Sequence, residues 1–179
     1  MAKILLLNGP PAAGKSTVSK LFLESQKPNE WAYISHDDIR QLVKSGYSSA
    51  DGTREMWNEE TEAQWAVGVE NCVDLAINFQ QDGISCIVDF YATEEDFKQW
   101  QELLGKADYV QVILLPNKAI DVARNAQRKP PAHLTNKKMA ESYEAFKSWA
   151  NNQEVVLIDN SAQTAKQTVK HLRSLLKDE

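Results

Sequence analysis

The feature that most constrains this chain is one octapeptide near its start, Gly9-Pro10-Pro11-Ala12-Ala13-Gly14-Lys15-Ser16. It fits the pattern G-x-x-x-x-G-K-S, and it stands between an apolar run at residues 3–8 and a run with helical spacing at 16–23. A strand that leads into a glycine-rich turn and then a helix is the context that such a loop requires. The loop N–H groups and the helix N-terminus then surround a polyphosphate with positive partial charge. Average residue frequencies would give this pattern by chance in fewer than about one such chain in a hundred.

The loop therefore predicts a site for a nucleoside triphosphate with Mg²⁺. Lys15 is expected to reach the β- and γ-phosphates, and the Ser16 hydroxyl is expected to hold Mg²⁺. ATP is favoured over GTP because the nearest candidate for a guanine-reading motif, residues 117–120, lacks the required acid. The predicted nucleotide-binding residues are Gly9, Pro10, Pro11, Ala12, Ala13, Gly14, Lys15, Ser16, Thr17, Arg124 and Asn160.

Length, charge and cysteine use narrow the class of protein. A chain of 179 residues fits one domain, spanning residues 1–179. The net charge of −5 disfavours a nucleic-acid partner, although it is compatible with a local basic groove. No apolar run is long enough to cross a membrane and no secretory leader is visible, so we expect a cytoplasmic protein. For the oligomeric state we expect a monomer or a homodimer. Cys72 and Cys86 have apolar neighbours and no C-x-x-C spacing, which predicts reduced, buried thiols.

Short apolar runs alternate with helical stretches along the whole chain. Such alternation predicts an α/β fold with a parallel sheet that is covered on both faces. The predicted strands are 3–8, 31–35, 85–88, 110–115 and 155–158. The predicted helices run from Asp37 or Asp38 to Gly46, from about 53 to 81, from Thr93, from 117 to 128, from Thr135 to about 150, and from Ser161 onward.

Polar side chains follow four of the predicted strands and should converge at the carboxyl edge of the sheet. Asp37 and Asp38 follow the second strand, and either could accept the proton of an acceptor hydroxyl, because position alone does not separate them. Asp89 ends the third strand, where an acid commonly holds Mg²⁺ directly or through water, although it could instead bind the acceptor.

Arg124 and Arg128 lie four residues apart, on one face of the helix predicted at 117–128. Arginine suits phosphate because its planar fork donates parallel hydrogen bonds and stays charged. We interpret residues of about 117–140 as a lid that stabilises charge in the transition state, with residues 130–133 as a hinged loop over the cleft. We interpret His36 as structural rather than substrate-binding, and Trp57 and Trp65 as core or pocket wall.

Three segments together resemble a known group: residues 9–17, His36-Asp37-Asp38-Ile39-Arg40 and Arg124-Asn125-Ala126-Gln127-Arg128. The chain is similar over roughly residues 3–160 to the small P-loop kinases, which include chloramphenicol phosphotransferase, gluconate kinase, zeta toxins and the kinase domain of phage polynucleotide kinase. The resemblance implies a three-layer P-loop NTPase fold with a five-stranded parallel sheet of order 2-3-1-4-5, helices on both faces and a helical lid. It also implies that Asp37 is the catalytic base, that Arg40 binds the acceptor, and that Arg124 and Arg128 are phosphate ligands.

These features predict an ATP-dependent kinase that phosphorylates a hydroxyl of a small molecule. In this hypothesis Asp37, Lys15, Arg124 and Arg128 are catalytic, Asp37, Arg40 and Asp89 face the acceptor, and Ser16 and Asp89 hold Mg²⁺. One alternative is a polynucleotide 5′-hydroxyl kinase, whose strand binding would weaken steeply with salt. A second alternative is a non-enzymatic, nucleotide-dependent switch or binding module.

Overall fold

The computed structural model describes residues 2–26, 30–48, 57–128, 134–150 and 155–176. Within these ranges, five strands form one parallel sheet in the order β2-β3-β1-β4-β5, which confirms the predicted order. The strands are β1 (Ile4–Asn8), β2 (Trp31–Ser35), β3 (Ser85–Asp89), β4 (Tyr109–Leu114) and β5 (Val156–Ile158). All four pairings are parallel.

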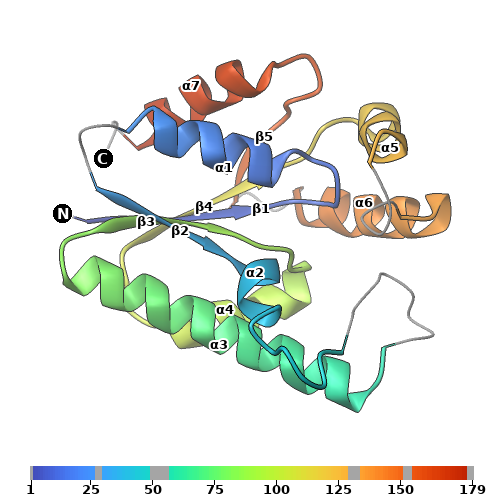
Figure 1. Ribbon diagram of the computed structural model, residues 1–179. Helices are drawn as coiled ribbons and strands as arrows, with labels where there is room; N and C mark the ends of the chain where they lie inside the picture. The colour runs from blue at the N-terminus through green and yellow to red at the C-terminus, as the bar shows by residue number, and fades with distance from the viewer. Residues whose placement is uncertain (1, 27–29, 49–56, 129–133, 151–154, 177–179) are drawn as a thin grey trace.

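Helices cover both faces of the sheet, so the predicted three-layer α/β architecture is confirmed (Figure 1). One face packs against α1 (Lys15–Glu24) and α7 (Ala165–Leu175), and the other packs against α3 (Glu59–Gln81) and α4 (Glu94–Leu104). Side chains of a strand point alternately to opposite faces. Leu5 and Leu7 of β1 accordingly join the core on the α1 side, whereas Ile4 and Leu6 join the core on the α3 side.

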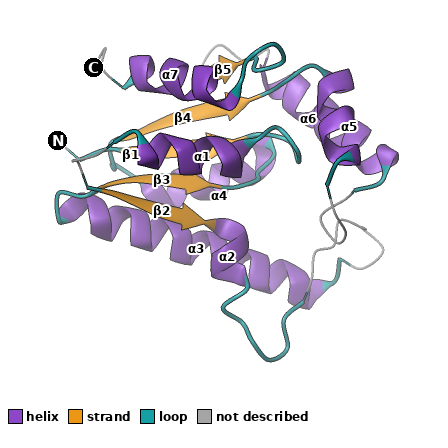
Figure 2. Ribbon diagram, turned by 45° about the horizontal axis from the view of Figure 1, so that its top comes forward, coloured by secondary structure: helices purple, strands orange, loops and turns teal. Residues whose placement is uncertain are grey.

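Three further helices stand at the carboxyl end of the sheet. Helix α2 (His36–Arg40) follows β2 directly, while α5 (Lys118–Ala126) and α6 (Asn136–Ala150) lie beyond the ends of the strands (Figures 1 and 2). The loop of residues 9–14, which joins β1 to α1, starts at this same edge. This arrangement brings the polar strand ends to one side of the molecule, as the sequence predicts.

Two predicted helix boundaries on the β2–β3 side of the sheet are wrong. Helix α2 ends at Arg40 rather than at Gly46, and residues 41–47, which include Leu42 and Val43, are exposed rather than packed on the core. Helix α3 begins at Glu59, after the cap Asn58, whose side-chain oxygen accepts from the Thr61 amide at 2.8 Å. Trp57 therefore precedes the helix, and the predicted start at residue 53 lies outside the described residues.

Two predicted boundaries on the β4–β5 side are also wrong. Helix α5 ends at Ala126, so Arg128 lies past the helix rather than on its face. The Asn125 side chain pairs with both backbone groups of Leu134, at 2.8 and 3.1 Å. The last helix is capped by Thr164 rather than Ser161, because Ser161 instead accepts from the Asn117 amide at 2.7 Å.

The two cysteines are buried and unbridged, as predicted. Burial in apolar surroundings raises the pKa of both thiols, Cys72 and Cys86, to about 12, because it disfavours the thiolate. In the described part of the chain no helix combines the length and the apolar character needed to span a membrane.

Gly68 sets the distance between α3 and α2. A Cβ at this position would lie 2.6 Å from Arg40 Cγ and 2.8 Å from His36 Nε2, so α2 packs directly on the α3 backbone. We expect Gly68→Ala to lower the free energy of unfolding by about 1–3 kcal/mol, because the overlap outweighs alanine's better helix propensity. Urea unfolding would measure this loss. The exposed neighbour provides the control, because Val67→Ala should change stability by less than about 0.5 kcal/mol, and equal stability of both variants would contradict the close packing.

Candidate functional site

The loop of residues 9–15 is held in a conformation that only small residues permit. Gly9 has φ 149°, and a Cβ there would lie 2.4 Å from the Leu114 carbonyl oxygen of β4. Gly14 caps α1 with φ 98°, and Ala12 also adopts a positive φ of 67°. A positive φ in a residue other than glycine is uncommon and is found at tightly determined sites. The loop is therefore a packed cradle rather than an open turn.

Asn8 fastens this cradle to the segment that follows β3. Its side-chain oxygen accepts from the amides of Gly9 at 2.8 Å and Ala92 at 3.1 Å, and its Nδ2 donates to the Ala92 carbonyl at 2.9 Å. Asn8 is fully buried. The loop and residues 90–92 consequently form one rigid rim at the end of the sheet.

The Lys15 ammonium lies over the loop. Its Nζ donates to the carbonyl oxygens of Gly9 at 2.8 Å and Pro10 at 3.1 Å. Burial lowers the pKa of Lys15, while the negative charges of Asp89, Asp37 and Asp121 act in the opposite direction. Lys15 therefore lies among three acids, two at strand ends (Asp89 and Asp37) and one on α5 (Asp121).

Asp89 is buried at the end of β3. Tyr33 of β2 donates from its hydroxyl to Asp89 Oδ2 at 3.1 Å. Burial raises the pKa of Asp89, whereas Lys15, a hydrogen bond from Ser16 and the Tyr33 hydroxyl lower it. The same neighbourhood raises the pKa of Tyr33, chiefly through burial and then through the Asp89 charge. Tyr33 was not among the predicted site residues, although it lies two residues before the end of β2.

Asp37 and Asp38 are both exposed at the start of α2, and they face different partners. The charge of Asp37 acts on Lys15 and on Asp89, whereas the charge of Asp38 acts on Tyr33. The Asp38 amide also donates to the capping Ser35 hydroxyl at 3.2 Å. Asp37 thus shares the space of Lys15 and Asp89.

Arg124 of α5 crosses to the loop and to the turn after β5. Its guanidinium donates to the Ala13 carbonyl at 3.2 Å and to the Asn160 carbonyl at 3.1 Å. The Asn160 side chain also donates to Ala13 at 2.9 Å, and its own oxygen is buried with no hydrogen-bond partner among the described residues. Arg124, Ala13 and Asn160 therefore form one wall beside the cradle, and the unpaired Asn160 oxygen is open to a donor.

Asp121 is a component of the site that the sequence reasoning missed. Its side chain is 1% exposed, and neither carboxylate oxygen has a hydrogen-bond partner within the described chain. Burial raises the pKa of Asp121 to about 6, although the cations Lys15, Arg124 and Arg128 oppose the shift. Asp121 lies three residues before Arg124 on the same helix face, and this spacing was the available signal.

We expect Asp121→Asn to stabilise the nucleotide-free protein increasingly as pH rises. A raised carboxyl pKa means that the folded state binds more protons than the unfolded state between about pH 4 and 6, so stability falls across that window. A shift of two pKa units corresponds to about 3 kcal/mol above pH 6, where the cost is complete. Urea unfolding at pH 5 and pH 8 would measure a gain that is about twice as large at pH 8. A variant less stable than the parent at pH 8 would show instead that the three cations make the Asp121 charge net favourable.

The remaining predicted residues lie farther from this cluster of charges. Arg128 is exposed just beyond α5, although its charge reaches Lys15 and Asp121. Arg40 is buried, its guanidinium stacks on Trp65 at 4.7 Å, and it donates to the Ser48 carbonyl at 3.1 Å. His36 is 1% exposed and packs on Trp65, and burial lowers its pKa to about 4, in keeping with a structural role. The predicted hinged loop at 130–133 lies outside the described residues.

The residues present fit a nucleotide with Mg²⁺. Gly9 and Gly14 hold the loop in positive-φ conformations that glycine adopts readily, and Lys15 and Arg124 both donate to loop carbonyls. Ser16 and Asp89, at the start of α1 and the end of β3, offer oxygen ligands of the kind that Mg²⁺ prefers. Mg²⁺ commonly takes one or two protein oxygens together with substrate phosphates and water, so this pair is sufficient on the protein side.

The cradle, the parallel sheet and its strand order define the three-layer P-loop NTPase fold. Residues 4–152 match the AAA domain family (AAA_33), and the chain belongs to this family. No curated protein sequence matches it. The predicted resemblance to the small P-loop kinase group is thereby confirmed for family and fold.

Solved structures with the same fold include several kinases. A sugar kinase from Janibacter sp. HTCC2649 is 12% identical, with a TM-score of 0.71 over 99% of this chain and 95% of that chain. A candidate kinase from Chloroflexus aurantiacus j-10-fl is 15% identical, with a TM-score of 0.64 over 99% and 97%. A chain of the Pnkp1/Rnl/Hen1 RNA repair complex is 18% identical, with a TM-score of 0.62 over 84% of this chain and 45% of that chain. At these identities the likeness shows the fold alone.

Proposed function

We propose that this protein is an ATP-dependent kinase that transfers the γ-phosphoryl group of Mg·ATP to a hydroxyl of a small molecule. One observation carries the proposal. Lys15 follows β1 through the loop, Asp37 follows β2 and Asp89 ends β3, and these three strands are neighbours in the sheet, so all three side chains belong to the same edge. A phosphate-binding cation, a metal-binding acid and an exposed acid for the acceptor are the parts that phosphoryl transfer needs.

Each residue has a role in this reaction. Bound Mg·ATP supplies the phosphoryl group and part of the charge neutralisation. Lys15 donates to the phosphate oxygens, and Ser16 with Asp89 holds the metal. Asp37 orients the acceptor hydroxyl and takes its proton as the acceptor oxygen bonds to phosphorus and ADP leaves. Arg124 and Arg128 stabilise the charge on the transferring group.

ADP release from Mg·ATP across a panel of acceptors tests this proposal. The panel holds gluconate, neutral sugars, amino sugars, nucleosides, aminoglycoside and phenicol antibiotics, and a 5′-hydroxyl oligonucleotide, with the Asp37→Asn variant beside the parent. Release that an acceptor stimulates, and that is lost in the variant, supports a kinase. Equal, weak release with every acceptor in both proteins contradicts it and favours a nucleotide-dependent switch.

A polynucleotide 5′-hydroxyl kinase is the second candidate, because the fold also matches a chain of an RNA repair complex. The net charge of −5 speaks against it. Salt dependence separates the two functions. The KM for an oligonucleotide should rise steeply with salt because counterions are released on binding, whereas the KM for a small neutral acceptor should change little.

A further inference from the structure

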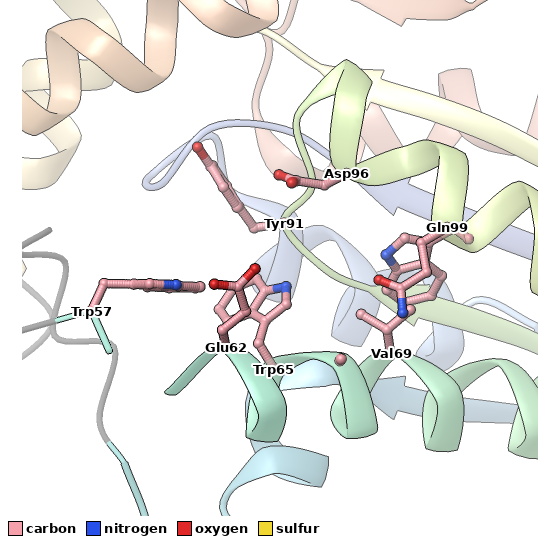
Figure 3. Close-up of a pocket in the computed structure, with 9 residues that line it drawn as sticks. Trp57, Glu62, Trp65, Val69, Tyr91, Asp96 and Gln99 are labelled. Carbon is pink, nitrogen blue, oxygen red and sulfur yellow. The ribbon is translucent and has the colours of Figure 1, made fainter. Parts of the chain in front are cut away.

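A pocket of about 190 Å³ lies between α3 and α4, and four of its nine lining residues are aromatic. Its aromatic members are Trp57, Trp65, Tyr91 and Trp100, and its charged members are Glu62 and Asp96. Figure 3 shows Glu62 rising from α3 beside Trp65, and Asp96 pointing from α4 toward Tyr91. We call this space the indole pocket.

The indole pocket adjoins the two acids of the candidate site. Trp100 packs on Phe90 with ring centroids 4.2 Å apart and on His36 at 6.1 Å. Phe90 directly follows Asp89, and His36 directly precedes Asp37. The wall of the pocket is therefore built on the residues that position both acids.

The rim of the pocket is also continuous with the loop and with α6. Tyr91 precedes Ala92, whose backbone is paired with Asn8 at the base of the loop. The Ser142 hydroxyl of α6 donates to the Tyr91 hydroxyl at 3.4 Å. A molecule in the pocket would thus lie beside residues 90–92, the segment that Asn8 ties to the phosphate-binding loop and that Tyr91 links to α6.

The charges of the pocket select against anions. Two carboxylates, Glu62 and Asp96, line the pocket, and no lysine or arginine lines it. The Arg40 guanidinium stacks against Trp65 at 4.7 Å and offsets part of this negative charge, while Asp37 and Asp89 add to it from the adjoining site. An acceptor that is a sugar acid or a phosphate ester would bring a further negative charge to these carboxylates.

The aromatic walls complement a cation. Trp57 and Trp65 are in contact, with centroids 5.4 Å apart and planes 53° apart, so their faces form a corner beside Glu62. Indole faces attract ammonium groups, and an adjacent carboxylate adds a direct electrostatic attraction. The volume is below the 300–1,000 Å³ typical of drug-sized ligands, which suits a compact molecule.

We propose that the indole pocket is the acceptor site and that it selects a compact acceptor carrying both a hydroxyl and a cationic amine, such as an amino alcohol or an amino sugar. This inference rests on the proposed kinase function. Glu62 and the indole faces of Trp57 and Trp65 bind the ammonium group, and the hydroxyl is directed toward Asp37.

Matched probes test this proposal by binding rather than by turnover. Choline is compared with 3,3-dimethyl-1-butanol, which has the same shape without the charge, and D-glucosamine is compared with D-glucose and D-gluconate. Tryptophan fluorescence and calorimetry would follow binding in the presence of a non-hydrolysable Mg·ATP analogue. In at least one series the amine should bind at least about tenfold more tightly than its neutral partner, and gluconate should bind least.

Two variants, Glu62→Gln and Glu70→Gln, distinguish the effect of losing a charge in the pocket from the effect of losing one elsewhere on α3. Both glutamates are exposed on this helix, and Glu70 is not part of the pocket. Glu62→Gln should reduce the preference for the amine to less than about threefold, whereas Glu70→Gln should leave it unchanged. Asp96 is a less suitable target because its carboxylate also caps α4 through Thr93, at 2.7 and 3.1 Å.

The outcomes of these binding and transfer experiments test the pocket proposal separately from the proposed kinase function. Equal or tighter binding of the neutral or acidic probes overturns the pocket proposal, as does an amine preference that Glu62→Gln does not alter. Transfer to an acceptor whose KM is unchanged in Glu62→Gln overturns it while leaving the kinase function in place. Amine binding that depends on Glu62, without any ADP release that depends on Asp37, supports the pocket and contradicts the kinase.

Discussion

Asp37→Asn is expected to lower kcat for phosphoryl transfer by about 10²–10⁴-fold while leaving the affinity for Mg·ATP within about threefold of the parent. The amide keeps the shape of the side chain and cannot take a proton from the acceptor hydroxyl. Asp37 is exposed, and the α2 hydrogen bond that it makes, from the Gln41 amide at 3.1 Å, uses its backbone carbonyl, which Asn keeps, so the fold should be retained. Steady-state ADP release with a saturating acceptor measures kcat, and calorimetry measures nucleotide affinity.

Asp38→Asn provides the matched control, because the two acids are adjacent on the same helix and equally exposed. The charge of Asp38 acts on Tyr33, and its amide rather than its carboxylate contacts the cap residue Ser35. We expect a change in kcat of less than about threefold. A larger loss in Asp38→Asn than in Asp37→Asn would assign the base to Asp38 and contradict the role given to Asp37.

Lys15→Ala is expected to impair both nucleotide binding and transfer. The ammonium is the cation closest to the loop carbonyls, and its loss removes a charge-assisted contact worth about 1.5–3 kcal/mol, or about 10–100-fold in Mg·ATP affinity. Transfer at saturating nucleotide should fall by a further factor of about 10²–10³, because a preorganised donor to the developing charge is lost. Calorimetric titration and single-turnover rates measure the two effects separately.

Lys20→Ala makes the same chemical change at an exposed position of α1 and should leave both quantities unchanged. The Lys20→Ala variant therefore controls for the loss of one positive charge in Lys15→Ala. An unchanged affinity for Mg·ATP in Lys15→Ala would remove the basis for interpreting residues 9–16 as a phosphate-binding loop.

The arrangement of Lys15, Asp89 and Asp37 could be anticipated from the sequence because each residue adjoins a strand that is recognisable by itself. Continuous apolar runs identified the strands, and the parallel sheet brings their carboxyl ends together. The choice between Asp37 and Asp38 could not be made from these local patterns. It required the family resemblance, and the assignment of the base to Asp37 stays a prediction that the Asp37→Asn and Asp38→Asn variants test.

The sequence could not place side chains whose partners are distant along the chain. Arg40 lies stacked on Trp65 because Gly68 lets α2 pack directly on α3, and no local pattern indicates this contact; its role toward the acceptor stays a prediction. Asp121 has no local signal beyond its spacing from Arg124, and only the docking of α5 on the loop brings it close to Lys15. The indole pocket likewise needs residues from two helices and from the segment after β3.

The sequence by itself determined the phosphate-binding loop, the five strands, the alternation that gives a three-layer fold and the acids at the strand ends. These depend on local spacing and on residues that tolerate particular backbone angles, which neighbouring residues specify. The tertiary structure alone decided where α2 and α5 end, which cations face Asp121 and which aromatic rings enclose the pocket. Those features depend on packing between elements far apart in sequence, and a periodic pattern carries no information about which faces meet.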